Sequence, residues 1–497
     1  MEVLLAQSCE HVGEIVYASA SLAEAGDRSP GPGAVRDTFR AVDLYRPVLA
    51  KALFPAFEAA RGRPTVPLLR FLRESERWPI ERLRDLQAGF LRRLVRHAYR
   101  HTAYYRALLD ERGLRPEDFT SPDDVAKLPL LDRTTLRAAF DARTATAPPA
   151  VAIRKTTSGS SGEPVQVRYN AESRHWRDAI RWRGYGWGGY EIGMRALHYW
   201  GFMPGEIITW WKQRKMDLDR LLKRDCYLDC TPRDERSLTE VVDAIRRFRP
   251  HVIVAYASGA GALARFIDER GLRTWDPIPV LTGAERLLPP DRATIERALG
   301  PAFDTYGCRE VMLMGSECEL HDGLHTSMEN LIIEVVVREP GGRVRAARPG
   351  ESGEVAITDL HNLACPMIRY VNGDIATARD AAPCACGRTL PRIGPIEGRV
   401  TETLYDGAGN PVGGLVFNIL LSAIGHAVEN FQVVQRADRS IVFKVVPSDG
   451  QRLPEREEQL LRNQAERYLP GAPFVIELVK EIPLSPAGKR RVVVVEK

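Results

Sequence analysis

The chain has 497 residues, of which 44% are hydrophobic and 27% are charged. This length exceeds what one hydrophobic core usually organises, so we expect two or more domains. The 70 lysines and arginines nearly balance the 65 aspartates and glutamates, and a net charge of +5 gives no indication of a nucleic-acid partner. No apolar run approaches the ~18 residues that span a bilayer, and eight cysteines are too few for a disulfide scaffold. We therefore expect a cytoplasmic protein with no membrane partner, and the sequence leaves its oligomeric state open.

The N-terminal part of the chain is predicted to be a short segment followed by helices. Residues 1–35 lack the basic start of a signal peptide and end in a stretch rich in Gly and Pro, which indicates a linker. In residues 36–112, apolar side chains recur at helical spacing with arginines between them. We interpret these arginines as a solvated helix face over a core stripe rather than as a nucleic-acid site.

The middle of the chain has the pattern of an α/β protein. Between about residues 150 and 400, short β-rich runs such as 251–257 and 331–337 alternate with amphipathic stretches such as 237–249. This alternation predicts a sheet layered with helices. We therefore expect a large multi-layer α/β domain over residues 36–398 with a helical N-terminal segment. A small, mobile α+β domain is expected over 399–497.

One loop has a composition suited to phosphate. The sequence KTTSGSSGEP at residues 155–164 lies between two probable strands. Its glycines allow the backbone to approach a ligand closely, and its hydroxyls and exposed N–H groups hydrogen-bond phosphate oxygens. It is not the Walker-type loop, because no Lys-Ser/Thr follows the second glycine at the needed spacing. A flexible Ser/Gly hairpin explains this segment alone equally well.

Four further motifs follow this loop in a fixed order. They are YGCRE at 306–310, RYVNGD at 369–374, GR at 398–399 and PLSPAGK at 483–489. Together with the loop, they resemble the ordered motifs of the acyl-adenylate-forming superfamily, from about residue 80 onward. The stretches at 91–109 and 121–133 are similar to the phenylacetate–CoA ligase branch and to the related capsule-biosynthesis proteins. No single motif is specific, but the ordered set is.

The resemblance implies activation of a small-molecule carboxylic acid by ATP and Mg²⁺, with release of pyrophosphate. Charge builds on phosphoryl oxygens in such a step, so donors and a divalent cation must be in place beforehand. It implies catalytic roles for Thr157, Glu310 (as the Mg²⁺ ligand) and Lys489. It also implies nucleotide binding by Ser158, Gly159, Ser160, Ser161, Gly162, Gly283, Ala284, Glu285, Tyr306, Gly307, Asp374 and Arg399. Each motif has a simpler explanation when it is taken alone. Glu310 is then a surface glutamate in a turn, and Asp374 is part of an Asn-Gly-Asp turn. Tyr306 is then a core tyrosine, and Lys489 belongs to a solvated basic tail.

The acyl acceptor is less well indicated than adenylation. Coenzyme A is the acceptor that the resemblance implies. In the family, a hinge between the large and the small domain follows the Gly-Arg motif and often carries paired acids or a lysine. Here residues 400–403 (VTET) occupy that position. Residues 404–413 resemble the capsule-type branch more closely. The alternative is therefore an adenylating enzyme that transfers its acyl group to an amine, a carrier-protein thiol or another nucleophile. Glu163 in the phosphate loop leaves a third reading, a non-catalytic nucleotide-binding protein.

Two pairs of Cys and His residues indicate a structural zinc site. Cys318 and His325 form one pair, and Cys384 and Cys386 form the other. In a reducing compartment such pairs indicate a metal rather than a disulfide, and three thiolates with one imidazole make a closed tetrahedral set. His321 is the alternative histidine ligand, but the pattern of the phenylacetate–CoA ligase branch favours His325. Buried free cysteines are the alternative interpretation.

The acid pocket is placed in an aromatic stretch. Residues 181–202 are dense in aromatic residues and glycine and lie where the resemblance places the acyl pocket. Aromatic walls suit a flat aryl acid. We predict that Tyr199, Trp200 and Tyr256 line the pocket, and we favour an aryl or arylacetic acid over a long fatty acid.

Overall fold

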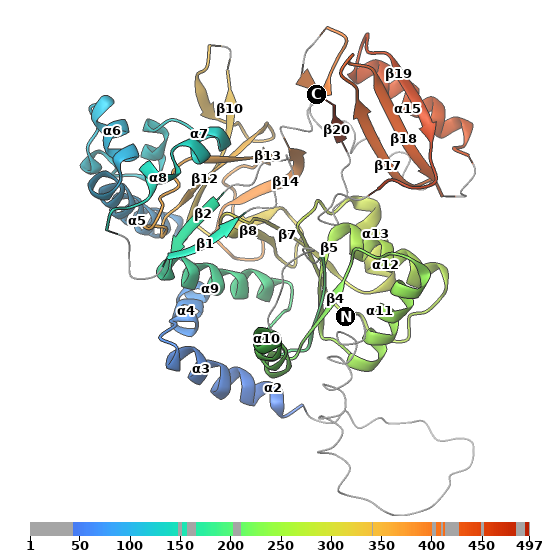
Figure 1. Cartoon of the computed structure of the whole chain (residues 1–497), viewed down its shortest axis with the longest axis horizontal. Helices are drawn as coiled ribbons and strands as arrows, with labels where there is room; N and C mark the ends of the chain where they lie inside the picture. The colour runs from blue at the N-terminus through green and yellow to red at the C-terminus, as the bar shows by residue number, and fades with distance from the viewer. Residues whose placement is uncertain are drawn as a thin grey trace, which may run out of the picture.

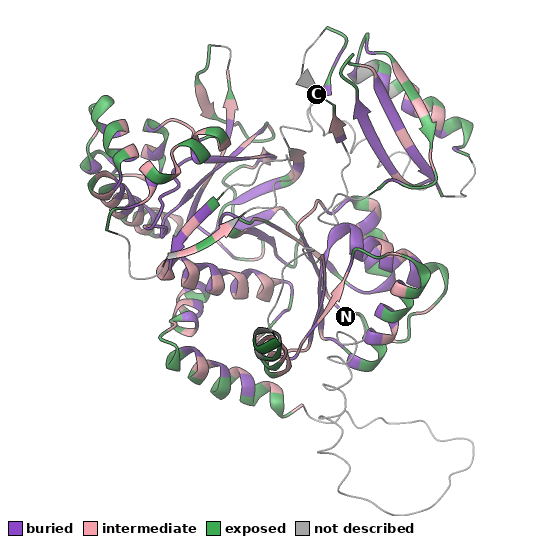
Figure 2. Ribbon diagram, in the orientation of Figure 1, coloured by how far each residue is buried: buried purple, intermediate pink, exposed green. Residues whose placement is uncertain are grey.

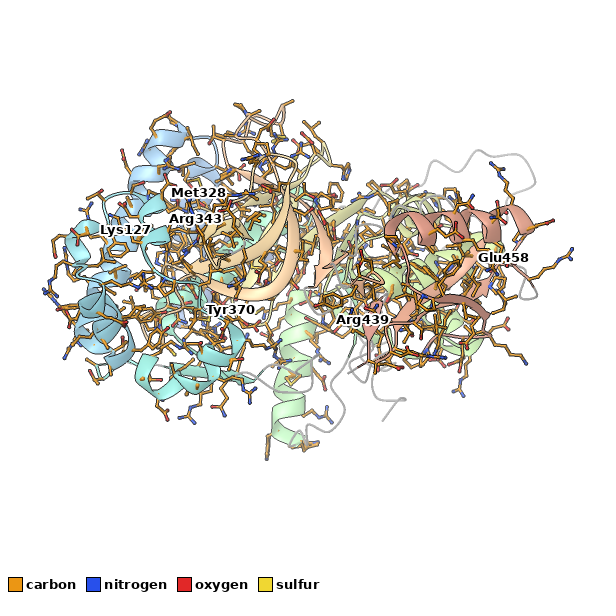
Figure 3. All side chains as sticks on the ribbon, turned by 90° about the horizontal axis from the view of Figure 1, so that it is seen from above. Lys127, Met328, Arg343, Tyr370, Arg439 and Glu458 are labelled. Atoms are coloured by element: carbon orange, nitrogen blue, oxygen red, sulfur yellow. The ribbon has the colours of Figure 1, made fainter. Side chains whose placement is uncertain are left out.

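The computed structural model describes residues 43–147, 152–156, 166–201, 210–339, 341–399, 404–408, 411–412, 427–448, 452–483 and 493–496. Most of the chain forms a large mixed α/β body, and the C-terminal part forms a smaller one (Figure 1). Seen from above, Tyr370 lies in the large body, whereas Arg439 and Glu458 lie in the small one (Figure 3). The predicted phosphate loop at 157–162 and the predicted catalytic Lys489 lie outside the described residues.

Helices form the first part of the described chain. They are α2 (Tyr45–Val48), η1 (Leu49–Leu53), α3 (Phe54–Ala60), α4 (Thr65–Ser75), α5 (Ile80–His101), α6 (Ala103–Glu111), η2 (Pro116–Asp118), η3 (Pro122–Lys127), α7 (Arg133–Ala138) and α8 (Phe140–Arg143). The longest, α5, buries Leu91 and Leu94 on one side and exposes Arg96 on another, as its spacing predicts. Thr102 ends α5 and caps α6, because its side-chain oxygen accepts a hydrogen bond from the Tyr105 N–H.

A twelve-stranded sheet forms the centre of the large body, in the order β11-β10-β12-β13-β14-β9-β8-β7-β6-β5-β3-β4. Its strands are β3 (Ala196–Trp200), β4 (Asp225–Asp229), β5 (Val252–Tyr256), β6 (Val280–Gly283), β7 (Ala302–Cys308), β8 (Met312–Glu317), β9 (Leu324–Thr326), β10 (Leu331–Arg338), β11 (Val344–Ala346), β12 (Ser352–Asp359), β13 (Tyr370–Ala378) and β14 (Arg392–Arg399). The pairs among β3 to β7 are parallel, and all other pairs are antiparallel. Separate from this sheet, β1 (Ala152–Thr156) and β2 (Gln166–Asn170) form an antiparallel hairpin that flanks the predicted phosphate loop.

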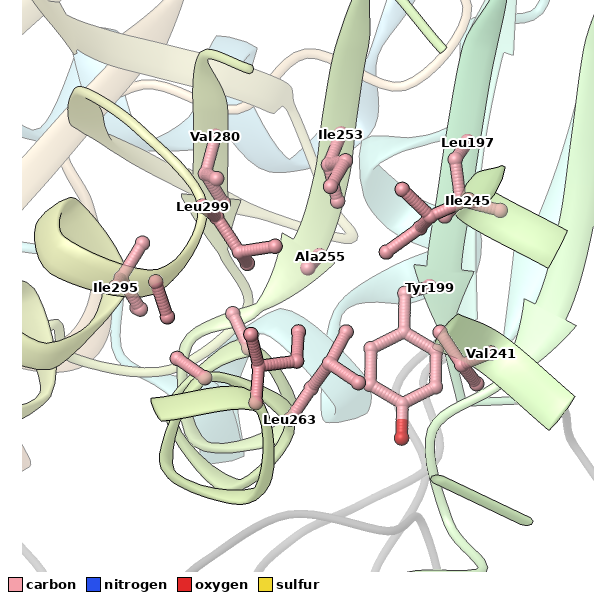
Figure 4. Packing of buried hydrophobic residues seen from close by; sticks show 14 of the residues in the cluster. Leu197, Tyr199, Val241, Ile245, Ile253, Ala255, Leu263, Val280, Ile295 and Leu299 are labelled. Carbon is pink, nitrogen blue, oxygen red and sulfur yellow. The ribbon is translucent and has the colours of Figure 1, made fainter. Parts of the chain in front are cut away.

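Helices cover both faces of the parallel half. α9 (Ala171–Trp187) covers one face, while α11 (Glu235–Phe248), α12 (Ala257–Glu269) and α13 (Pro289–Ala298) cover the other (Figure 1). A further helix, α10 (Trp210–Lys223), links β3 to β4. Because strand side chains alternate between faces, neighbouring residues enter different cores. Leu197 packs under α11 and α12 (Figure 4), whereas Ala196 packs on the α9 side. The inner strands β3, β5 and β6 are buried almost throughout (Figure 2), as expected of a parallel sheet, whereas the edge strand β4 is mostly half-buried.

The antiparallel half of the sheet curves strongly. Three strands separate β7 from β13 in the sheet order, yet Tyr306 on β7 and Tyr370 on β13 belong to one buried cluster. Met314 on β8 and Ile393 on β14 fill the same cluster. The curve therefore brings side chains from sequence-distant strands into a common interior, which is where two of the predicted motifs meet.

The C-terminal body has its own core and a different architecture. It contains β17 (Val428–Gln435), β18 (Ile441–Pro447), β19 (Phe474–Leu478) and β20 (Val493–Val495) in the order β19-β18-β17-β20, together with α15 (Glu455–Tyr468) and the short pair β15 (Leu404–Tyr405) and β16 (Pro411–Val412). Phe431, Phe443 and Leu461 are buried together in it. The predicted fold class, a large α/β domain with a small α+β domain, is confirmed. Nowhere in the described ranges is a helix long and apolar enough to cross a membrane.

Candidate active site

The parallel strands end together at one edge, where three of the predicted residues, Trp200, Tyr256 and Gly283, lie side by side. Tyr199 on β3 is level with Ala255 on β5, so Trp200 is level with Tyr256, and Tyr256 is level with Gly283 on β6. The carboxyl edge of a parallel sheet is where α/β proteins place their ligands. The rings of Trp200 and Tyr256 lie 4.5 Å apart and nearly perpendicular, which is a favourable aromatic pair.

The structure places Tyr199 away from this edge. It is fully buried in the core under α11 and α12, beside Val241 and Leu263 (Figure 4). Its hydroxyl has no hydrogen-bond partner among the described residues. Since Tyr199 and Trp200 are consecutive in a strand, they face opposite sides of the sheet. Of the two neighbouring residues predicted for the pocket, the geometry favours Trp200, and Tyr199 is a core residue.

The segment that follows β6 is held tightly. A side chain at Gly283 would come within 2.9 Å of the Thr305 hydroxyl and 3.5 Å of the Trp200 indole. Ala284 has a φ of 65°, which is rare for a residue with a side chain. The Glu285 carboxylate accepts a hydrogen bond from the Ser258 N–H at the start of α12, at 3.0 Å. The backbone of residues 283–285 therefore has one fixed conformation at the carboxyl edge, as a segment that lines a planar ligand such as a nucleotide base requires.

The turn between β7 and β8 presents a buried carboxylate. Gly307 has no room for a side chain, because a Cβ would lie 2.4 Å from the Met312 carbonyl oxygen. This tight hairpin places Glu310, which is only 6% exposed. The Tyr370 hydroxyl donates to Glu310 Oε1 at 3.2 Å. No lysine, arginine or histidine of the described ranges forms an ion pair with Glu310.

A buried carboxylate normally pairs with a cation or binds a metal. The Glu310 carboxylate accepts a hydrogen bond from a neutral group, the Tyr370 hydroxyl. Burial and the charge of Glu310 raise the pKa of Cys308 well above its usual range, so the thiol stays neutral. A hard oxygen ligand without a protein counter-charge fits Mg²⁺, which binds through one or two protein oxygens and keeps several waters.

A second carboxylate, Asp374, lies in a dense hydrogen-bond network. Tyr306 Oη donates to Asp374 Oδ2 at 2.9 Å, and Asn372 Nδ2 donates to the same oxygen at 2.6 Å and to Tyr306 Oη at 2.8 Å. Asn372 Oδ1 accepts from the Asp374 N–H at 3.0 Å. Burial and the charge of Asp374 raise the pKa of Tyr306 well above its usual range, so its phenol remains a donor. On the adjacent strand, Arg399 is the backbone partner of Asp374.

Sequence reasoning assigned Tyr306 to the nucleotide and gave Tyr370 and Asn372 no role. The ring of Tyr306 packs inside the curved sheet, and its hydroxyl points to Asp374. Tyr370 and Asn372 stand inside the RYVNGD motif, but their partners in the YGCRE motif lie 60 and 66 positions earlier. Only the curvature of the sheet reveals these contacts. The signal in the sequence was the presence of a tyrosine in both motifs.

The structure also brings together the four predicted zinc ligands. Sγ of Cys318, Cys384 and Cys386 and a ring nitrogen of His325 all lie within 4.8 Å of one another. Cys318 follows β8, His325 lies on β9, and the two other cysteines lie in the connection between β13 and β14. His321 turns elsewhere, since its Nδ1 lies 2.9 Å from Glu317.

The chemistry of this cluster suits a closed metal site. His325 Nδ1 lies 3.1 Å from the Leu390 carbonyl oxygen, so Nδ1–H donates there and Nε2 is left to bind a metal. Burial lowers the pKa of His325 to about 4, which keeps the imidazole neutral. Burial also raises the pKa of Cys318 to about 12, so this thiol ionises only beside a cation. Burial also tends to raise the pKa of Cys386, but hydrogen bonds with Arg388 outweigh the effect of burial and lower the pKa of this thiol.

Relatives with assigned activities match most of the chain. A phenylacetate–coenzyme A ligase from Thermus thermophilus is 30% identical over 376 residues, which are 74% of this chain and 81% of that protein. The Escherichia coli phenylacetate–coenzyme A ligase is 27% identical over 336 residues, covering 65% and 73% of the two chains. The CapK protein of Staphylococcus aureus is 25% identical over 266 residues, covering 52% and 56%. No family model matches the chain.

Solved structures share the fold. A 2-hydroxyisobutyryl-CoA ligase in its postadenylation state superposes with a TM-score of 0.63 at 18% identity, covering 83% of this chain and 89% of that one. The same ligase in its thioesterification state gives a TM-score of 0.53. The fold, the ordered motifs and the extent of the sequence match lead to one assignment. The chain belongs to the phenylacetate–coenzyme A ligase family of adenylate-forming enzymes.

Proposed function

We propose that this enzyme activates an aryl or arylacetic acid with ATP to give an acyl-adenylate and pyrophosphate, and then transfers the acyl group to coenzyme A. The observation that carries the proposal is the pair of buried carboxylates from the two motifs, Glu310 and Asp374, each of which accepts a hydrogen bond from a tyrosine of the other motif. Two buried carboxylates of this kind suit a magnesium nucleotide. The assigned activity of the relatives supports the same reaction.

In this proposal, the substrate carboxylate attacks the α-phosphorus of ATP and pyrophosphate leaves. Glu310 would hold Mg²⁺, which supplies positive charge to the phosphate oxygens. Asp374 would accept hydrogen bonds from the ribose hydroxyls, and Gly283, Ala284 and Glu285 would line the adenine. These contacts orient the nucleotide before reaction, which is where most of the rate enhancement of phosphoryl-type transfers arises.

The remaining parts of the machinery are assigned by resemblance alone. Residues 157–162 would cradle the phosphates through their hydroxyls and backbone N–H groups. Lys489 would approach the α-phosphate and the incoming carboxylate, and Arg399 would contact the nucleotide near the hinge. Replacing Lys489 with alanine is expected to reduce adenylation on the order of 10²-fold or more, as loss of one preorganised charge does.

The acid class is proposed from the aromatic pair at the strand ends. Trp200 and Tyr256 lie edge to face and border Gly283, the residue next to the proposed nucleotide path. An aromatic ring between such walls gains dispersion and edge-to-face contacts that an alkyl chain does not match. The relatives that act on phenylacetate support an arylacetic acid in particular.

A second acceptor remains a specific alternative. The match to CapK and the altered residues 400–403 motivate the alternative, in which the acyl group goes to an amine, a carrier-protein thiol or another nucleophile instead of coenzyme A. The first half-reaction is the same in both cases. Turnover of a preformed adenylate with coenzyme A decides between the two.

We also propose that Cys318, His325, Cys384 and Cys386 bind one structural Zn²⁺. With four protein ligands the metal has no open position for substrate, so it would tie the β8–β9 turn to the β13–β14 connection and take no part in the reaction. The neutral imidazole and its hydrogen bond to Leu390 support this role.

Acid-dependent exchange of labelled pyrophosphate into ATP tests the proposed adenylation. A panel of aryl, arylacetic and long-chain acids should support exchange with the aryl and arylacetic members. Addition of coenzyme A should then yield the thioester. Exchange with no acid, in protein that binds ATP, would contradict adenylation. Exchange without thioester formation would favour the alternative acceptor.

A further inference from the structure

The two proposed carboxylates are hydrogen-bonded by tyrosines in a crossed arrangement. Tyr306, from the first motif, donates to Asp374 of the second, at 2.9 Å. Tyr370, from the second motif, donates to Glu310 of the first, at 3.2 Å. Each motif therefore supplies one carboxylate and the phenol that holds the carboxylate of the other motif. We call these two hydrogen bonds the crossed braces.

Both braces lie inside the curved sheet. Tyr306 is 6% exposed and Tyr370 is fully buried, and their rings share one hydrophobic cluster with Met314. Packed rings of this kind leave their hydroxyls few alternative directions, so each carboxylate is held in one orientation. Burial and the nearby carboxylates also raise the pKa of both tyrosines, which keeps them protonated donors.

The donor at Glu310 differs from the donor at two other buried carboxylates, Glu329 and Asp359, which arginines hold. Glu329 is paired with Arg183 at 2.7 Å, and Asp359 is paired with Arg177 at 2.6 Å. A guanidinium neutralises the carboxylate that it holds, whereas a phenol orients a carboxylate and leaves its negative charge in place. A tyrosine donor such as Tyr370 therefore fits a carboxylate that must keep its negative charge to bind a ligand. An arginine donor fits a carboxylate that only stabilises the fold.

Asn372 adds a second donor to one brace. Its amide nitrogen donates to Tyr306 Oη and to Asp374 Oδ2, and its amide oxygen accepts from the Asp374 N–H. The side chain thus fixes the position of the phenol and of the carboxylate together. Its side-chain hydrogen bonds within the described residues go to Tyr306 and Asp374 and not to Glu310, so Asn372 belongs to one brace alone.

We propose that the crossed braces are separate positioning devices. Tyr306 and Asn372 orient Asp374 toward the ribose of the nucleotide, and Tyr370 orients Glu310 toward Mg²⁺. The proposal rests on the adenylating function proposed above and goes further, because it divides recognition of ribose and of metal between two tyrosines. In this role each tyrosine acts through the carboxylate that it holds.

Equilibrium binding of nucleotides by calorimetry tests this division without turnover. Tyr306→Phe is expected to reduce the preference for ATP over 2′-deoxy-ATP or 3′-deoxy-ATP about fivefold or more, with the Mg²⁺ requirement unchanged, because one hydrogen bond is lost. Tyr370→Phe is expected to raise the Mg²⁺ concentration for half-maximal ATP binding by a similar factor, with the ribose preference unchanged. Asn372→Ala should follow Tyr306→Phe.

Tyr105→Phe is the matched control. Tyr105 is buried, and its hydroxyl bonds the Pro366 carbonyl oxygen in another core cluster, so removing it should change neither quantity. Equal shifts of both quantities in Tyr306→Phe and Tyr370→Phe would show a general structural role and overturn the proposal. So would wild-type protein that binds ATP without any ribose preference. Wild-type protein that binds no ATP would instead contradict the proposed function itself.

Discussion

The two ends of β8 (Met312–Glu317) carry two polar sites of opposite character. Glu310, just before the strand, is a buried carboxylate held by a neutral donor and suited to a ligand that arrives and leaves. Cys318, just after the strand, belongs to a set of three thiols and one imidazole whose ligand atoms all lie within 4.8 Å of one another. About 20 Å of strand separates them at ~3.4 Å per residue. The difference in ligand chemistry is what supports the proposal of an exchangeable magnesium site at one end and a permanent metal site at the other.

The largest expected effect is the loss of the metal from the Cys/His set. Changing Cys384 and Cys386 to serine should reduce bound zinc from about one equivalent to background, as expected for a site with four protein ligands. Because binding of a structural metal adds to folding free energy, the thermal midpoint should fall by about 5 °C or more. Elemental analysis and calorimetry measure the two quantities.

His321→Ala is the control for the zinc prediction, and His325→Ala is its partner. His321 bonds Glu317 and should leave the zinc content unchanged, whereas loss of His325 should lower it. Protein that is free of metal yet equally stable would rule out the structural zinc.

The next effect is the loss of adenylation when the proposed magnesium ligand is replaced. Glu310→Gln keeps the shape but removes the charge proposed to hold Mg²⁺, so adenylation should fall on the order of 10²-fold while the zinc content stays constant. Glu354→Gln is the control, because this residue pairs with Arg338 on the same sheet. Pyrophosphate exchange measures the loss. Equal activity of the two variants would remove Glu310 from the machinery.

A smaller effect concerns Asp304, a half-buried carboxyl on β7 whose backbone N–H donates to Glu317. Burial, and then the charge of Glu317, raise the pKa of Asp304 to about 7. The folded pKa lies above the unfolded one, so this group costs stability progressively as the pH rises from about 4 to about 7, at about 1.4 kcal/mol per pKa unit. Asp304→Asn should therefore stabilise the protein relative to wild type at pH 8 and much less at pH 5. Denaturant titrations at both pH values check this, and a difference independent of pH would contradict it.

The smallest effect sharpens the assignment of the acid pocket. Trp200→Leu should lower kcat/KM for aryl acids about tenfold and leave the KM for ATP unchanged, because an aromatic wall contributes about 1 kcal/mol beyond its buried area. Tyr199→Phe is the control, since that hydroxyl lies in the core on the other face of the sheet. If both variants behave alike in steady-state assays, Trp200 does not line the pocket.

Sequence reasoning succeeded where the signal is local. Strand–helix alternation predicted the α/β architecture, and the paired Cys and His residues predicted a cluster that the structure assembles. It failed where the answer depends on which face a side chain takes, as for Tyr199. It was also silent on the crossed braces, because Tyr370 and Glu310 meet only through the curvature of the sheet.

The central claim, adenylate formation, is tested most directly by a single turnover with ATP labelled at the α-phosphate and an arylacetic acid, without coenzyme A. The account predicts labelled acyl-AMP bound to the enzyme and one equivalent of pyrophosphate, with Glu310→Gln forming neither at a comparable rate. Labelled ADP and free phosphate would show cleavage at the γ-phosphate instead and would contradict the account.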